Sequence, residues 1–289
     1  MATKSKSEEA RSRRERADAI RAAQKRKQRS LTLVTGTVVA VVVVVLGLLV
    51  AKSISDEPQA DPSETSGLAS SAVVDAIEKV PTSVFDSVGT GTAANPPKKI
   101  AGEPLTADGK PRVLYVGSEY CPFCAAERWG LTVALSRFGS FTGLGQTASD
   151  PSDVDPNTNT LSFHGATYTS TYLSFTGYEE EDRTRSKTLD TLSSADQATT
   201  AKYNSSGSIP FVDVAGSYTS SGASYDPALL AGMSHAEIAK ALSDPSSAAG
   251  KAIIGTANQF TAALCKVTGN QPANVCTSAG VTAAAGQLG

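Results

Sequence analysis

Two cysteines, Cys121 and Cys124, enclose a proline and a phenylalanine in the segment Cys-Pro-Phe-Cys. A thiolate attacks a disulfide, and a second cysteine one helical turn later can resolve the mixed disulfide that forms. Because Pro122 suits the first turn of a helix, we expect Cys121 at a helix N-terminus, where the helix dipole favours a thiolate. The spacing predicts thiol–disulfide exchange, with Cys121 as the nucleophile and Cys124 as the resolving cysteine.

The alternative for a C-x-x-C pair is half of a zinc site, which needs a second pair of ligands at suitable spacing. The other cysteines, Cys265 and Cys276, are separated by ten residues, which favours a structural disulfide that closes a short loop. The alternative is that Cys265 and Cys276 form a second redox pair that exchanges electrons with Cys124. His164 and His235 are single and far apart in the sequence. We therefore expect neither a metal ion nor a cofactor.

The elements around the motif are those of a mixed α/β domain. Val113–Val116 is a short apolar run that predicts a buried strand leading directly to the cysteines, and residues 125–138 have helical composition. Ser234 and Glu237 form a capping-box pattern at the start of a later helix. The further elements expected in chain order are a helix within 189–203, a turn and strand at 208–214, a hairpin at 216–222, and helices at 234–242 and 248–264.

This order of elements resembles the thioredoxin superfamily. Residues 113–138 resemble its first strand, active-site turn and first helix, and Ile209-Pro210 resembles its cis-proline loop. The motif is similar to the Cys-Pro-aromatic-Cys of glutaredoxins and to the Cys-Pro-His-Cys of periplasmic disulfide oxidants. The resemblance implies a thioredoxin-like central sheet with flanking helices. It also implies that Ile209 contacts the substrate through its backbone and that Pro210 shapes the cleft.

A second resemblance covers most of residues 70–280. The segments 115–138, 163–178 and 265–276 look like an uncharacterised bacterial family of membrane-anchored thioredoxin-like proteins, known as a domain of unknown function. This resemblance implies a fold and leaves the physiological role open.

The chain departs from the better-known families at two places. They carry a buried acid six residues before the first cysteine, where this chain has Tyr115. Glu127 is a candidate proton relay in its place, although we favour a solvated helix carboxylate. Phe123 cannot supply the imidazole of the Cys-Pro-His-Cys enzymes, so the pattern does not distinguish an oxidant from a reductant or an isomerase.

Residues 31–50 contain no charged residue and include five consecutive valines, which predicts one transmembrane helix. Eleven Lys or Arg and four Asp or Glu precede this span, giving residues 1–30 a charge of +7, whereas the rest of the chain carries -9. The positive-inside rule then places the N-terminus in the cytoplasm and the C-terminal domain outside it, as in a single-pass signal anchor. A cleavable signal peptide is the alternative.

We therefore expect a membrane-anchored, extracytoplasmic thiol–disulfide oxidoreductase. Its partners would be thiols or disulfides of exported proteins and a membrane redox partner, and we expect no nucleic acid, because a basic arm beside a span is explained by membrane orientation. The alternative is a redox-inactive binding or scaffold module with structural disulfides. The predicted organisation is a basic cytoplasmic arm (1–30), a transmembrane helix (31–50), a flexible tether (51–68), an N-terminal extension (69–99), a thioredoxin-like domain (100–280) with an insertion at about 139–188, and a tail (281–289).

Overall fold

The computed structural model describes residues 67–288. The predicted arm and transmembrane helix, and all but the last two residues of the predicted tether, lie outside the described residues. Within 67–288, no helix combines the length and the apolar character that a membrane crossing requires.

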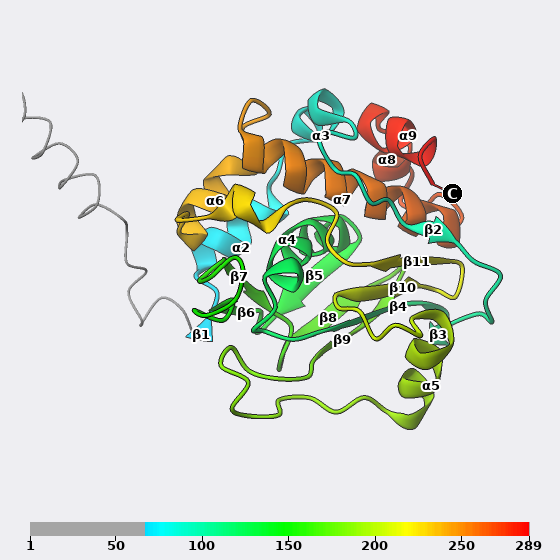
Figure 1. Ribbon diagram of the computed structural model, residues 1–289. Coiled ribbons are helices and arrows are strands. Elements are labelled where there is room, and N and C mark those ends of the chain that lie inside the picture. Colours follow the sequence, from blue (N-terminus) through cyan, green and yellow to red (C-terminus); the bar gives the residue numbers. More distant parts are fainter. Residues whose placement is uncertain (1–66, 289) are drawn as a thin grey trace, which may run out of the picture. The chain divides into compact units, whose positions relative to one another are not determined.

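The described chain is a mixed α/β structure whose helices and strands follow one another as Figure 1 shows. The strands are β1 (Gly67–Leu68), β2 (Lys98–Lys99), β3 (Thr106–Ala107), β4 (Lys110–Gly117), β5 (Gly139–Thr142), β6 (Gly145–Ala148), β7 (Asn159–Ser162), β8 (Thr167–Ser170), β9 (Ser174–Glu179), β10 (Phe211–Val214) and β11 (Tyr218–Ser221). The helices are α2 (Ser71–Glu78), α3 (Thr82–Val88), α4 (Pro122–Ser136), α5 (Ser194–Tyr203), a 3-10 turn η1 (Pro227–Leu230), α6 (His235–Ala241), α7 (Ala248–Val267), α8 (Ala273–Cys276) and α9 (Ala279–Ala285).

Strand β4 is the centre of the main sheet. It pairs in parallel with β9 and antiparallel with β10, and β11 and then β2 extend the sheet beyond β10. The short strand β3 forms a hairpin with the beginning of β4. Parallel neighbours need a long crossover connection, and here that connection contains α4 and the segment from β5 to β8. The strand that leads to the cysteines is therefore held by hydrogen bonds along both of its edges.

Successive residues of β4 face opposite sides of the sheet. Val113 and Tyr115 belong to the large core, whereas Leu114 and Val116 belong to a smaller one that includes Phe211. Helices α4 and α7 cover the first face and α5 covers the second (Figure 1). Because both faces are covered, this strand has the continuous apolar sequence of a buried parallel strand.

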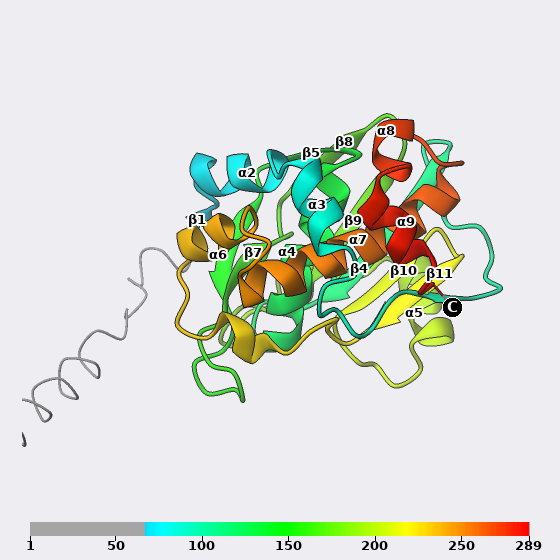
Figure 2. The ribbon, with the colours of Figure 1, turned by 90° about the horizontal axis from the view of Figure 1, so that it is seen from above.

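Helix α7 lies alongside α4, with α8 and α9 near its C-terminal end (Figures 1 and 2). A Cβ on Gly130 of α4 would collide with the side chain of Thr256 of α7, so glycine permits the close approach of the two helices. All residues of α4 from Cys124 to Leu135 are buried. The cysteine-bearing helix is therefore enclosed and has no extended solvent face.

Several sequence predictions are confirmed, and others differ from the structure. The strand at 113–116, the capping-box helix and the long helix beginning at Ala248 are present. The helix expected within 189–203 starts only at Ser194. Strands β5 and β6 lie in the predicted insertion at about 139–188, for which the sequence indicated no strand at these positions, and they pair with β8 and with β7 and β1. The expected tail contains most of α9, where Val281 and Ala284 are buried against the core.

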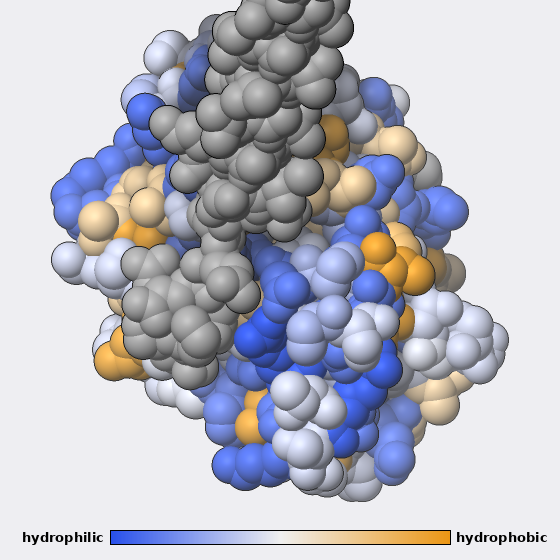
Figure 3. Space-filling view, turned by 60° about the vertical axis from the view of Figure 1, so that its left-hand side comes forward, coloured by the Kyte–Doolittle hydropathy of each residue, from blue (hydrophilic) through white to orange (hydrophobic). Residues whose placement is uncertain are grey.

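On the face drawn in Figure 3, hydrophilic residues predominate and hydrophobic residues form small separate areas. The large hydrophobic side chains exposed within the described part of the chain are Leu68, Phe123, Val154 and Leu229. Phe123 is of interest among them because it lies between the two cysteines of the motif.

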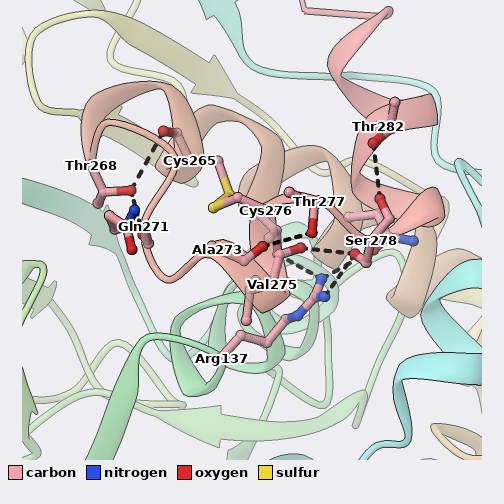
Figure 4. The surroundings of a disulfide bond; sticks show 12 residues. Arg137, Cys265, Thr268, Gln271, Ala273, Val275, Cys276, Thr277, Ser278 and Thr282 are labelled. Carbon is pink, nitrogen blue, oxygen red and sulfur yellow. Dashed lines mark hydrogen bonds between the residues drawn. A yellow bond between two sulfur atoms is a disulfide. The ribbon is translucent and has the colours of Figure 1, made fainter.

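The predicted disulfide between Cys265 and Cys276 is present and joins the last turn of α7 to the end of α8 (Figure 4). Arg137, which follows α4, donates through Nη2 to Ser278 Oγ and through Nη1 to Thr261 Oγ1, both at 3.3 Å. Ser278 precedes α9, which packs against α3 and α7. The disulfide and these hydrogen bonds hold the C-terminal helices against the core.

Replacing both disulfide cysteines, C265A/C276A, should lower the free energy of unfolding by about 2 to 3 kcal/mol, because the cross-link restricts a short loop of the unfolded chain. Urea unfolding of the full chain, followed by circular dichroism, measures this difference. Equal midpoints and slopes for the wild type and the double variant would show that the cross-link does not contribute to stability.

Candidate active site

The paired cysteines lie where strand β4 passes into helix α4. Cys121 is the N-cap residue of α4 and Pro122 lies in its first turn, as the sequence predicts. The Cys121 Sγ accepts a hydrogen bond from the Cys124 amide N–H at 3.2 Å. The Cys121 amide in turn donates to the carbonyl oxygen of Ser118, also at 3.2 Å. The sulfur of Cys121 therefore occupies the position of a capping oxygen, at the positive end of the helix dipole.

The two thiols have different environments. They are not joined by a disulfide, and Cys121 is 5 % exposed while Cys124 is completely buried. Hydrogen bonding from Cys124 lowers the pKa of Cys121, and this effect, with a smaller one from the charge of Arg128, outweighs burial. Burial, together with the hydrogen bond to Cys121, raises the pKa of Cys124 well above its usual value. Cys121 is the better nucleophile of the pair, and it is also the less buried one.

The loop before β10 brings a backbone carbonyl close to the thiol of Cys121. The Ile209–Pro210 bond is cis, as the resemblance to thioredoxins implies, and the Ile209 carbonyl oxygen lies 3.9 Å from Cys121 Sγ. A pocket of about 580 Å³ opens beside Ile209, and Glu180 and Glu181 contribute to its lining. The structure thus brings Ile209 and Pro210, the predicted substrate-binding residues, next to Cys121, although 88 residues separate Ile209 from it in the sequence.

A second hollow adjoins the motif at Phe123. Phe123 is 43 % exposed and lines it together with Asp155, Ser224 and Tyr225. The Tyr225 hydroxyl donates to the Ala126 carbonyl of α4 at 2.7 Å. The motif is therefore flanked by two depressions, one beside Ile209 and one beside Phe123.

Glu127 is not the solvated helix carboxylate that we favoured from the sequence. It is fully buried, and its two oxygens accept hydrogen bonds from the Ser224 amide at 2.7 Å and the Ser224 hydroxyl at 2.9 Å. Burial raises the pKa of Glu127 to about 7, although both Ser224 hydrogen bonds act to lower it. The expectation failed because α7 and the segment after β11 cover the side of α4 that a typical surface helix exposes. Its role as a proton relay remains a prediction.

The sequence reasoning missed a buried ion pair next to the cysteines. Arg128 Nε and Nη2 donate to the two carboxylate oxygens of Glu179, both at 2.7 Å, and neither side chain is exposed. Arg128 Nη2 also donates to the Ser118 carbonyl at 2.6 Å. The signal was available, because Arg128 follows Cys124 by four residues and shares its helix face. Nothing in the sequence, however, indicated the partner on β9.

Tyr115, which replaces the acid of better-known families, is completely buried on the α4 side of the sheet. Its hydroxyl has no hydrogen-bond partner within the described residues. Burial raises the pKa of Tyr115 well above its usual value, so the phenol stays neutral. Position 115 therefore holds a neutral hydroxyl instead of a titrating carboxylate.

A family model described as a domain of unknown function (DUF929) matches residues 96–192 and 189–266, which is more than half of the chain. The chain belongs to the DUF929 family. This confirms the predicted resemblance to a family known only as a domain of unknown function. The DUF929 match includes the Cys-Pro-Phe-Cys motif, the Ile209–Pro210 loop and Cys265. No curated protein and no solved structure matched the chain in the two other comparisons.

Within residues 67–288, no three His, Cys, Asp or Glu side chains are grouped so that they could hold a metal ion. Both histidines of the chain have protein partners. His164 Nδ1 is paired with Asp190 at 2.8 Å, and His235 Nε2 lies 2.8 Å from the Thr160 carbonyl oxygen. The groups at the Cys-Pro-Phe-Cys motif that could take part in chemistry are the two thiols and the polar side chains packed around them.

The buried Glu127 of this DUF929 protein predicts a specific pH dependence of stability. Its pKa is about 7 in the folded chain against a usual 4.5, so the folded state binds the proton more tightly. The stability that Glu127 gains from this proton is fully present below its pKa in the unfolded chain. It is lost as the pH rises through its pKa in the folded chain. Between pH 5 and pH 8, the free energy of unfolding of the wild type should therefore decrease by roughly 2 to 3 kcal/mol relative to that of E127Q.

Denaturant unfolding of both proteins across this pH range measures that difference. E237Q is the matched control, since Glu237 is an exposed capping-box residue whose pKa is lowered by hydrogen bonds from Ser234. The E237Q difference should not change from pH 5 to pH 8. A flat difference for E127Q as well would show that Glu127 is ionised throughout in the folded chain.

Proposed function

We propose that this DUF929 protein is a thiol–disulfide oxidoreductase in which Cys121 attacks and Cys124 resolves. The observation that carries the proposal is the position of Cys121 Sγ. It caps helix α4, is the less buried of two unlinked thiols, and lies 3.9 Å from the carbonyl oxygen that precedes cis Pro210. Disulfide exchange requires a nucleophilic sulfur and a resolving sulfur. The nearby Ile209 carbonyl adds a backbone group that a bound polypeptide could contact.

We also propose that the fold is thioredoxin-like. The sequence of elements β4, α4, β9, α5, β10, β11 and α7 is the order that led us to expect this fold. The pairing supports it, because β4 and β9 are parallel on either side of the α4 crossover while β10 and β11 form an antiparallel hairpin. Helices on both faces of the sheet also agree with the proposal.

The exchange proceeds in two balanced steps. The Cys121 thiolate attacks one sulfur of a substrate disulfide, so a mixed disulfide forms and the other substrate sulfur leaves as a thiolate. Cys124, after losing its proton, attacks Cys121 Sγ, forming the Cys121–Cys124 disulfide and releasing the second substrate thiolate. The substrate gains two electrons and the protein loses two. The reverse sequence oxidises a substrate dithiol.

The surroundings of Cys121 suit a polypeptide substrate. The Ile209 carbonyl is positioned to contact the backbone of a chain whose sulfur is bound to Cys121, and the pocket beside Ile209 gives room for neighbouring side chains. We propose exported proteins as substrates, with residues 31–50 as the membrane anchor. The Cys265–Cys276 disulfide supports a location outside the cytoplasm, since disulfides persist in oxidising compartments.

Serine replacements separate the roles of the two thiols. C121S should lose disulfide exchange by at least about 1,000-fold, because the nucleophile is gone. Serine is also a good N-cap residue, so the start of α4 should be preserved. C124S should accumulate a mixed disulfide at Cys121, since no resolving thiol remains. Incubation of the full chain in detergent with oxidised glutathione, followed by peptide mapping, detects both results.

Two results would contradict this assignment. Retention of full exchange activity by C121S would remove Cys121 from the chemistry. A wild-type Cys121–Cys124 pair that stays oxidised in every glutathione buffer would make the motif a structural disulfide, and the protein would then be a redox-inactive binding or scaffold module. Circular dichroism of each variant controls for loss of the fold.

A further inference from the structure

A permanent positive charge is buried next to the proposed redox pair. An arginine side chain stays protonated in proteins, and Arg128 is completely buried in the core between α4 and β9. Burial alone would lower the pKa of Arg128, but the charge of the facing Glu179 is the largest of the effects that hold that pKa well above its usual value. Inside a protein the effect of such a charge on its neighbours is larger than in water.

The backbone ties this guanidinium to the turn that holds Cys121. The Ser118 carbonyl oxygen accepts both the Cys121 amide, at 3.2 Å, and Arg128 Nη2, at 2.6 Å. On the helix, Arg128 follows Cys124 by one turn and shares its face. The charge is therefore fixed relative to both sulfurs by short connections within one turn and one helix.

The pairing of Arg128 does not use all of its donors. Glu179 accepts from Nε and Nη2, whereas Nη1 has no hydrogen-bond partner within the described residues although it is buried. The hydroxyl of Tyr115, on the neighbouring strand, is also without a partner there. A buried donor without a partner costs about 1 to 3 kcal/mol.

We propose that Arg128 is a positioning residue that makes the Cys121–Cys124 couple more oxidising, an inference that rests on the proposed function. A fixed positive charge stabilises a thiolate but not a neutral disulfide, so it favours the reduced form of the couple. The more stable the reduced form, the more readily the oxidised protein takes two electrons from a substrate dithiol.

The surrounding charges agree with this direction. The charge of Arg128 lowers the pKa of Cys121, after the larger effect of the Cys124 hydrogen bond. It also opposes the burial that raises the pKa of Cys124. Glu179 compensates part of the charge, with its own pKa raised by burial against the effect of Arg128. Removing Glu179 alone and removing both partners together should therefore shift the reduction potential of the couple in opposite directions.

The test is the equilibrium of the full chain with glutathione, in which a reduced Cys121–Cys124 pair and oxidised glutathione give the disulfide and two reduced glutathiones. In R128M/E179Q both charges are lost, and the oxidation equilibrium constant should rise at least tenfold, a shift of about 30 mV to a lower potential. In E179Q the guanidinium keeps its charge without compensation, and the constant should fall. Each variant should also move the pH profile of Cys121 alkylation, upward in R128M/E179Q and downward in E179Q.

R112M/D196N is the matched control, because Arg112 and Asp196 form another ion pair of low exposure that joins β4 to α5. This double variant removes charges of the same kind and should leave the glutathione equilibrium within about twofold of the wild type, which corresponds to roughly 0.4 kcal/mol. Urea unfolding of every variant establishes that the fold is retained. If R128M/E179Q does not fold, the direction of the shift in E179Q decides.

The proposal is overturned if folded R128M/E179Q keeps the wild-type equilibrium constant and alkylation profile, or if E179Q moves the couple in the same direction as the double variant. Those results leave the oxidoreductase assignment intact. A wild-type pair that no glutathione buffer reduces would instead overturn the proposed function, and with it the role of Arg128.

Discussion

The enclosure of helix α4 is the constraint on which the rest of the structure depends. The helix lies between the main sheet and α7, and its residues from Cys124 to Leu135 are all buried. A buried polar group is costly unless the protein itself supplies a partner. The two charged residues in this stretch, Glu127 and Arg128, therefore need partners from other segments. The position of the thiols follows from how those partners are arranged.

The two buried charges connect α4 in different directions. Adjacent residues of a helix are about 100° apart around its axis, so their side chains reach different neighbours. Glu127 contacts Ser224 after β11, whereas Arg128 contacts Glu179 at the end of β9. The beginning of α4 is thus fixed to two segments that lie on either side of β4 in the sheet, one after β11 and one at the end of β9. A helix that is held in this way keeps Cys121 in a fixed geometry, which is the preorganisation that the proposed exchange would require.

The sequence predicted the elements with local signals and missed those decided by distant contacts. The strand before the motif, the cap at Cys121 and the capping box at Ser234 depend on neighbouring residues, and all are present. The partners of Arg128 and Glu127 are 51 and 97 residues away, and no local pattern indicates them. The strands β5 and β6 likewise have weak local propensity and form through pairing with β8 and β7.

The sulfur of Cys121 is also the acceptor that caps α4, so its chemical state affects the helix itself. A thiolate is a strong acceptor for the Cys124 amide, whereas a sulfur bound in a disulfide carries no charge and accepts more weakly. If the pair exchanges as proposed, reduction would therefore strengthen this capping hydrogen bond and oxidation would weaken it. In the exchange proposed above, the Cys124 amide would lose its charged acceptor whenever Cys121 enters a disulfide, so the strength of this hydrogen bond would follow the oxidation state of the pair.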